Sequence, residues 1–214
     1  MEYGKRTEQQ IQPDSSDTVE SKQSIFEMQA QTKFIAIALL YAFSILATST
    51  FLRLPILIPT QWVSVVFFVL ITPIFLYSFS AMVRPLMVIA ICFPSLALGE
   101  LLWCALFGCG GELLVNLIFT FSTWGIACLL ISLLRTRNEL LAMFTGGLWT
   151  FLGLLVPATI YYAFILDWSA LYMIVYALLA MSVHVVLIPF AFILNRVVHK
   201  LLEVQFFDEL VLLE

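Results

Sequence analysis

Residues 113–166 read LLVNLIFTFSTWGIACLLISLL, then RTRNE, then LLAMFTGGLWTFLGLLVPATIYYAFIL. Each apolar run is at least as long as the roughly 20 residues that an α-helix needs to cross a bilayer. The runs are continuous rather than alternating, which favours helices over the strands of a membrane barrel. The polar break at 135–139 carries two arginines, as cytoplasmic loops do. The stretch therefore predicts two spans joined by a cytoplasmic turn.

The rest of the chain repeats this pattern of apolar runs and short polar breaks. The 214 residues are 62% hydrophobic and 11% charged, which is too little polar surface for a soluble protein. We expect an all-α integral membrane protein, a bundle of six transmembrane helices. The expected spans are about 34–52, 62–82, 86–107, 113–134, 140–166 and 169–198. They form a transmembrane domain at 34–198, between a polar N-terminal tail at 1–33 and an acidic C-terminal segment at 199–214.

Lysine and arginine divide unevenly between the two sides that six spans define. One side carries nine of the ten, namely Lys5, Arg6, Lys22, Lys33, Arg84, Arg135, Arg137, Arg196 and Lys200. The other side carries Arg53. Five or seven spans would destroy this alternation. Because cytoplasmic loops retain Lys and Arg, we expect a multi-pass protein of the cell (plasma) membrane with both termini in the cytoplasm.

The segments outside the spans carry further predictions. Residues 1–33 lack an apolar core and so are not a cleavable signal peptide. We expect disorder at 1–18 and a short interfacial helix at 19–32. Prolines exclude regular helix from the connection at 54–59, which we expect to dip back against the bundle. The pattern of segment 199–214 predicts an amphipathic cytoplasmic helix. Its polar face is acidic and the inner leaflet is negative, so binding to a protein partner is at least as favourable as lying on the membrane.

The sequence holds no motif for catalysis or for metal or nucleic-acid binding. It lacks a GxxxxGK[ST] loop, an HExxH pair and a nucleophile elbow, so we expect no enzymatic activity. The four cysteines form no CxxC pair and have no histidines at ligand spacing, so we expect no metal and no cofactor. Free apolar cysteine is the simplest interpretation, and a disulfide between Cys104 and Cys109 stays open. No strongly basic surface points to nucleic acid.

Glu100 lies inside the third expected span, about two turns from its outer end. An ionisable group at such depth costs roughly 2.5–3.5 kcal/mol on insertion scales and tends to face a cavity or a partner. We assign it to a ligand contact or a proton-binding carboxylate. The alternative is a protonated or hydrogen-bonded carboxylate with a structural role.

The outer halves of the spans hold most of the other polar and aromatic side chains. An aromatic belt accounts for Trp62 and Trp168 but needs neither Glu100 nor Asn116. Aromatic walls with a few polar groups are typical of a small-molecule pocket, which we expect among the third to sixth spans and open to the outside. His184 can titrate or pair with a carboxylate; the alternative is a neutral ring hydrogen-bonded between helices. The candidate ligand-binding residues are Glu100, Trp103, Asn116, Tyr161, Tyr162, Tyr172 and His184.

Small residues at helical spacing mark two close-packing faces. In the first span Ala38 and Ala42 are four apart, and this face is a candidate for docking another subunit. In the fifth span Gly146, Thr150 and Gly153 repeat at spacings of four and three, and contact inside the bundle suits them.

Three of these features together carry a family resemblance. They are Ala38-Leu39-Leu40-Tyr41-Ala42 in the first span, Gly99-Glu100-Leu101-Leu102 in the third, and the arginine break at 135–137. With six spans and both ends inside, the chain resembles the substrate-binding S components of energy-coupling-factor transporters. The resemblance covers about 34–200. It implies an AxxxA face that meets a transmembrane coupling subunit, and an outward-opening ligand site built from the later helices and the first loop.

The functional expectation is a substrate-binding subunit for uptake of a small organic, vitamin-like nutrient. Its partners would be the ligand from outside, membrane lipid, and a transmembrane coupling subunit with ATPases, because this chain has no ATP-binding motif of its own. The alternative is a non-catalytic structural or assembly subunit of a larger membrane complex, with the two tails as docking arms.

Overall fold

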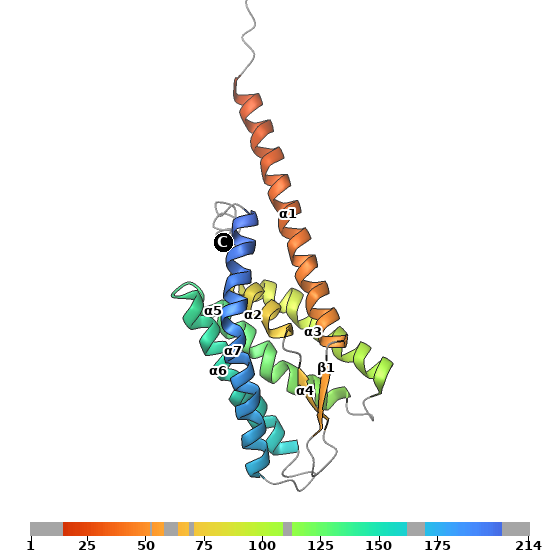
Figure 1. Cartoon of the computed structure of the whole chain (residues 1–214). Coiled ribbons are helices and arrows are strands. Elements are labelled where there is room, and N and C mark those ends of the chain that lie inside the picture. The colour runs from red at the N-terminus through yellow and green to blue at the C-terminus, as the bar shows by residue number, and fades with distance from the viewer. Residues whose placement is uncertain are drawn as a thin grey trace, which may run out of the picture.

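The computed structural model describes residues 15–51, 53–57, 64–68, 71–108, 113–161 and 170–202. Figure 1 shows a helical bundle with one small β-hairpin. The elements are α1 (Ser15–Phe51), β1 (Arg53–Leu57), β2 (Ser64–Phe68), α2 (Thr72–Met82), α3 (Pro85–Phe107), α4 (Leu113–Thr120), the π-helical turn η1 (Phe121–Gly125), α5 (Ile126–Leu134), α6 (Glu139–Ala158) and α7 (Ala170–Leu202).

Five helical stretches are long and apolar enough to cross a membrane. They are Gln31–Phe51, Pro85–Phe107, Leu113–Leu134, Glu139–Tyr161 and Ala177–Leu201. Each matches one of the predicted spans to within a few residues where the structure describes it. The helices also expose large apolar side chains on their outer faces, as lipid-facing helices do. The chain is therefore a multi-pass helical membrane protein.

The prediction of a continuous helix at 62–82 is wrong. Residues 64–68 form strand β2, and α2 begins only at Thr72 and has 11 residues. Pro73 lies in the first turn of α2, where backbone N–H groups have no acceptor within the helix, so the lack of an N–H costs nothing. Inside a longer helix the same proline would remove a backbone hydrogen bond and break or kink the helix. The run Ser64–Phe68 is rich in β-branched and aromatic residues, which favour a strand.

A hairpin occupies part of the first predicted loop and the beginning of the second predicted span. Strands β1 and β2 pair antiparallel, with Arg53 opposite Phe68 and Leu57 opposite Ser64. Pro55 is accommodated because a two-stranded sheet has only edge strands. The absence of helix around Pro55 is confirmed, while residues 58–63, including Pro59, lie outside the described part.

Helix α1 is longer than predicted. It runs without interruption from Ser15, so the expected interfacial helix at 19–32 is the first part of α1, and residues 15–18 are helical rather than disordered. Residues 1–14 and 203–214, with most of the predicted C-terminal helix, lie outside the described residues. The 37 residues of α1 extend about 55 Å, well beyond the roughly 30 Å of a bilayer core.

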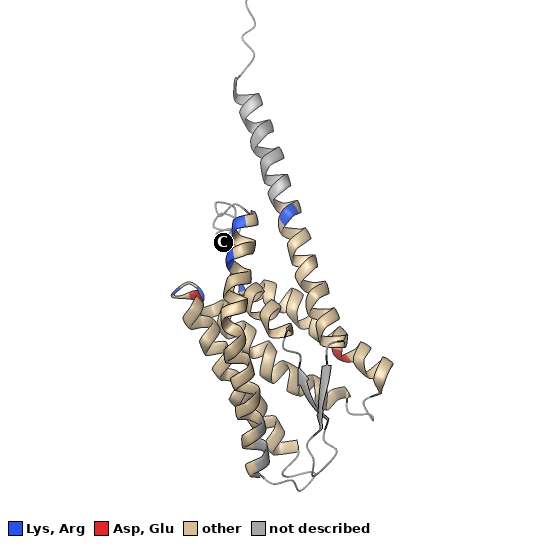
Figure 2. Ribbon diagram, viewed as in Figure 1, with Lys and Arg blue, Asp and Glu red and all other residues tan. Residues whose placement is uncertain are grey.

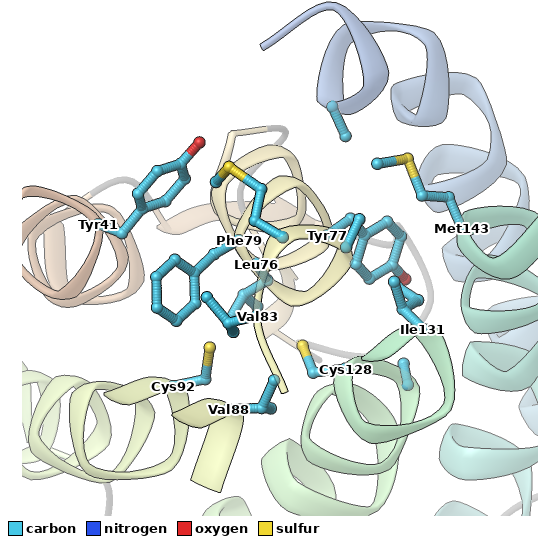
Figure 3. Close-up of a cluster of buried hydrophobic side chains, with 14 of the residues drawn as sticks. Tyr41, Leu76, Tyr77, Phe79, Val83, Val88, Cys92, Cys128, Ile131 and Met143 are labelled. Atoms are coloured by element: carbon cyan, nitrogen blue, oxygen red, sulfur yellow. The ribbon is translucent and has the colours of Figure 1, made fainter. Parts of the chain in front are cut away.

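Short α2 forms the centre of the bundle. Most of its residues are buried, as expected of an apolar helix too short to span the membrane. Figure 3 shows side chains from α1, α3, α5 and α6 gathered around it, including Tyr41, Cys92, Ile131 and Met143. Thr72 Oγ1 donates to Thr48 Oγ1 (2.9 Å) near the end of α1, so the first turn of α2 lies level with that end.

The bundle has two ends, which we name after residues that mark them. At the Arg135 end, Ser132 Oγ of α5 donates to the Val83 carbonyl just after α2. Figure 2 shows the described lysines and arginines gathered toward this end. Helix α3 begins beside Arg84 and runs away from this end to Cys104 in its last turn, and we call the region where α3 finishes and α4 begins the Cys104 end.

The small residues of α6 pack inside the bundle, as predicted. A Cβ on Gly146 would lie 2.5 Å from Ile131 Cγ1, and a Cβ on Gly153 would collide with the Ser122 carbonyl oxygen. Thr150 between them is fully buried. These glycines bring α6 close to α5 and η1.

Candidate functional site

Glu100 lies fully buried on α3, one turn from Cys104. Thr120 Oγ1, at the end of α4, donates a hydrogen bond to Glu100 Oε1 (2.8 Å). The neighbouring Gly99 lets α1 approach the same turn of α3, since a Cβ there would collide with the Ser49 hydroxyl. The carboxyl group therefore lies where α1, α3 and α4 meet, and the chain provides a hydroxyl donor for it.

The helix that supplies Thr120 widens into the π-helical turn η1 at the next residue. The Ile126 N–H donates to the Phe121 carbonyl, five residues back. A π turn leaves some backbone groups without their usual partners. Here Trp149 Nε1 of α6 donates to the Ser122 carbonyl (2.9 Å), and Ser122 Oγ donates to the Gly153 carbonyl (2.8 Å). Helix α6 thus stabilises the wide turn. Single π-helical turns of this kind are frequent at functional sites.

A second buried polar group lies on the far side of this turn. Trp124 Nε1 of η1 donates to His184 Nε2 of α7 (3.3 Å), and the other ring nitrogen, Nδ1, is 2.7 Å from the Tyr77 hydroxyl of α2. An indole N–H can only donate, so Nε2 accepts and the neutral ring carries its proton on Nδ1, toward Tyr77. The three side chains form a neutral network that ties α2, η1 and α7 together.

The predicted site residues have separate contacts in the structure, and His184 lies apart from Glu100. Asn116 is one helical turn before Thr120, on the Cys104 side, and Trp103 is nearly one turn beyond Glu100, with its ring on Phe107 (4.4 Å between centroids). Tyr161 packs edge-on against Phe119 of α4 (6.4 Å). His184 belongs to the separate network with Tyr77 and Trp124, the arrangement expected of a histidine bonded between helices. Tyr162 and the side chain of Tyr172 lie outside the described part.

Sequence reasoning missed the partners of these residues. Thr120 was not predicted because a threonine in an apolar helix is common, and only the pairing of α3 with α4 reveals its role. Tyr77 fell in the wrongly predicted second span, and Trp124 has no distinguishing sequence context. The one available signal was the spacing of Asn116, Thr120 and Trp124, which are four residues apart and would share one face of a regular α-helix.

The predicted docking face on α1 is largely internal. Ala38 is 7% exposed and belongs to the main hydrophobic core, and Ala42 is partly buried. The side chains that α1 exposes nearby are Leu39, Leu40 and Phe43. A partner or lipid beside α1 would meet these residues before Ala38.

The cysteines divide into two kinds. Cys104 is disulfide-bonded and is therefore not a free cysteine, the other possibility that the sequence left open. Cys109 lies outside the described residues. Cys92 and Cys128 are free and buried. Within the described ranges no three His, Cys, Asp or Glu side chains gather in a way that could hold a metal ion.

No family model, no curated protein and no solved structure matches this chain. What the fold and the site define is a class: a multi-pass helical membrane protein with a buried carboxyl group near one end and a neutral polar network at its centre. The particular function has to be argued from that geometry.

Proposed function

We propose that the chain is a membrane-embedded substrate-binding subunit for uptake of a small organic, vitamin-like nutrient, working with a separate ATP-driven coupling module. The observation that carries the proposal is the buried Glu100, held by Thr120 near the Cys104 end. An ionisable side chain inside a membrane bundle is a functional candidate by default, because its insertion is costly.

The proposed orientation of the protein in the membrane follows from the distribution of positive charge. We place the Arg135 end in the cytoplasm, since Arg84, Arg135 and Arg196 lie there. The disulfide-bonded Cys104 supports an outer location for the opposite end, because disulfides persist in oxidising compartments. Glu100 then lies in the outer half of a plasma-membrane protein.

Six crossings remain part of the proposal, with α2 making the second. Its first turn is level with the last turns of α1, and its end is level with the last turn of α5. The return path toward the cytoplasm is therefore made by a hairpin and a short buried helix instead of a long span, and both termini remain cytoplasmic.

The site chemistry limits the ligand class. A carboxylate accepts hydrogen bonds or pairs with a cation. Trp103, three residues after Glu100 on α3, and Tyr161, which packs against Phe119 next to Thr120, are the aromatic side chains that the proposal assigns to the ligand. The proposed ligand is a ring compound that carries an N–H donor or a positive charge. Glu100 is enclosed in this conformation, so binding requires α3 and α4 to separate near Thr120.

The test is to purify the full chain, denature it, and identify released organic compounds by mass spectrometry. The proposal expects one compound in near-stoichiometric amount, reduced in Glu100→Gln and unchanged in Glu139→Gln, which removes a carboxylate at the other end. A wild-type chain that releases no compound but holds tightly bound protein subunits contradicts the proposal.

That outcome would favour the second candidate, a structural or assembly subunit of a larger membrane complex. The observation in its favour is the length of α1, whose N-terminal part continues beyond a membrane thickness as regular helix and offers a docking arm.

A further inference from the structure

The Ser122 carbonyl is the backbone acceptor that the wide turn η1 leaves without its helical donor. In a regular α-helix the Ile126 N–H would donate to it, four residues back. In this structure the Ile126 N–H donates instead to the Phe121 carbonyl, five residues back, and to the Thr123 carbonyl, three residues back. Trp149 Nε1 of α6 donates to the Ser122 carbonyl in its place (2.9 Å). This carbonyl therefore has two competing donors, one in its own helix and one in α6.

Helix α6 has a matching irregularity. Pro157 lies inside α6 and has no N–H, so the Gly153 carbonyl, four residues back, loses its helical donor. Ser122 Oγ donates to that carbonyl (2.8 Å). Ser122 thus accepts from Trp149 through its carbonyl and donates to Gly153 through its hydroxyl. Each helix satisfies a backbone group that the other leaves open, and these two contacts favour the π register of η1.

One buried group opposes the π register. Thr123 Oγ1 is buried and has no hydrogen-bond partner within the part of the chain that the structure describes. A buried hydroxyl without a partner is unfavourable, whereas a threonine in a regular α-helix can donate to the carbonyl three or four residues back. The turn therefore has contacts that hold it in the π register and a buried hydroxyl that an α register can satisfy.

Packing differs on the two sides of η1. Of the eight residues of α4, the last two, Phe119 and Thr120, are buried, and Leu114 in the first turn is 70% exposed. After the turn, α5 is held by residues that are buried along its whole length, namely Ala127, Cys128, Ile131 and Ser132. Helix α4 can therefore turn with little loss of packing, while α5 stays in place.

We propose that η1 switches between this π register and an α register, and that the switch opens the Glu100 site. In the α register the Ile126 N–H replaces Trp149 as the donor to the Ser122 carbonyl. Because a π turn holds one extra residue, α4 then turns about its own axis by roughly 100°, the rotation of one residue in an α-helix. Thr120 is the last residue of α4, so the rotation moves its hydroxyl away from Glu100 and opens the side of the carboxyl group that Thr120 covers.

The experiment measures two distances by double electron–electron resonance, on the full chain in lipid nanodiscs without added ligand. Nitroxide labels are attached to cysteines that replace exposed residues: Phe43 of α1 with Leu114 of α4 in one sample, and Phe43 with Leu133 of α5 in the other. Cys92 and Cys128 are buried, and a sample without new cysteines measures background labelling. We expect a main and a minor distance for the first pair and a single distance for the second.

Variants that weaken the contact between η1 and α6 should shift this balance. Trp149→Phe should raise the ratio of the minor to the main distance about fivefold, as expected when one hydrogen bond is lost. Ser122→Ala removes the smaller group and should shift the ratio in the same direction, so it decides if Trp149→Phe fails to fold. The matched control is Ser182→Ala, whose hydroxyl donates within α7, and it should leave the ratio unchanged.

A single Phe43–Leu114 distance in wild type and in both variants overturns the proposal, as does an equal shift in Ser122→Ala and Ser182→Ala. A second distance that appears equally in the Phe43–Leu133 pair also overturns it, because α4 and α5 then move as one helix. The role of the switch in ligand entry rests on the proposed function, but this measurement does not. Two distances in a chain that releases no organic compound support the switch and contradict the proposed function alone.

Discussion

The two buried polar groups of the bundle differ in their chemistry. His184 is a neutral ring whose two nitrogens are bonded to Tyr77 and to Trp124, which ties α2, η1 and α7 together. Glu100 is an ionisable acid that accepts a hydrogen bond from Thr120, and such a group is costly to bury in a membrane bundle. The proposal therefore gives His184 a structural role and Glu100 the contact with a ligand. The segment from Thr120 to Trp124 joins them, because it contacts Glu100 at one end and His184 at the other.

The largest effect is expected for His184→Phe. Phenylalanine fills the space but leaves the Tyr77 hydroxyl and the Trp124 N–H buried without the ring nitrogens, at about 1–3 kcal/mol each. We expect the free energy of unfolding in mixed micelles to fall by about 2–6 kcal/mol. His184→Gln, which can still accept from Trp124 and donate to Tyr77, should lose clearly less. Equal losses in the two variants would mean that the hydrogen bonds do not matter.

A smaller effect is expected for Gly153→Ala, which tests the segment that joins the two groups. The new methyl would collide with the Ser122 carbonyl of η1, a backbone atom that cannot move alone. Such overpacking costs about 1–3 kcal/mol and should loosen both groups together. Gly147→Ala is the matched control, because its nearest neighbour is Ile188 Cδ1 (3.1 Å), the end of a flexible side chain. A thermal-unfolding shift no larger for Gly153→Ala than for Gly147→Ala would show that the turn tolerates displacement.

The smallest effect is expected for Thr120→Val, which removes the hydroxyl donor and keeps the shape. The loss of one hydrogen bond predicts about 1 kcal/mol of destabilisation in the same unfolding assay. Thr120→Ser should retain the wild-type value. If Thr120→Val were as damaging as His184→Phe, the Glu100 pair would be as structural as the His184 network, and the contrast between them would disappear.

The sequence was sufficient for the long spans because length and continuous apolarity decide them. Residues 113–134, for example, match α4, η1 and α5 together. It failed at α2 because 62–82 has the composition of a span, while Pro73 and the β-branched run before it set the local structure. Glu100 could be singled out from the sequence because burying its charge is costly. Thr120 could not, because its contact with Glu100 depends on the rotation of α4 against α3, which packing decides. The internal position of Ala38 was hidden for the same reason.

The measurement that tests the central claim most directly is ligand occupancy in Glu100→Gln beside His184→Gln, by mass spectrometry of compounds released from each purified chain. The account predicts that wild type and His184→Gln carry the same organic compound in near-stoichiometric amount, and that Glu100→Gln retains about a tenth or less, as expected when a charge-assisted contact worth about 1.5–3 kcal/mol is lost. Equal occupancy in Glu100→Gln and wild type, with both folded, would contradict it.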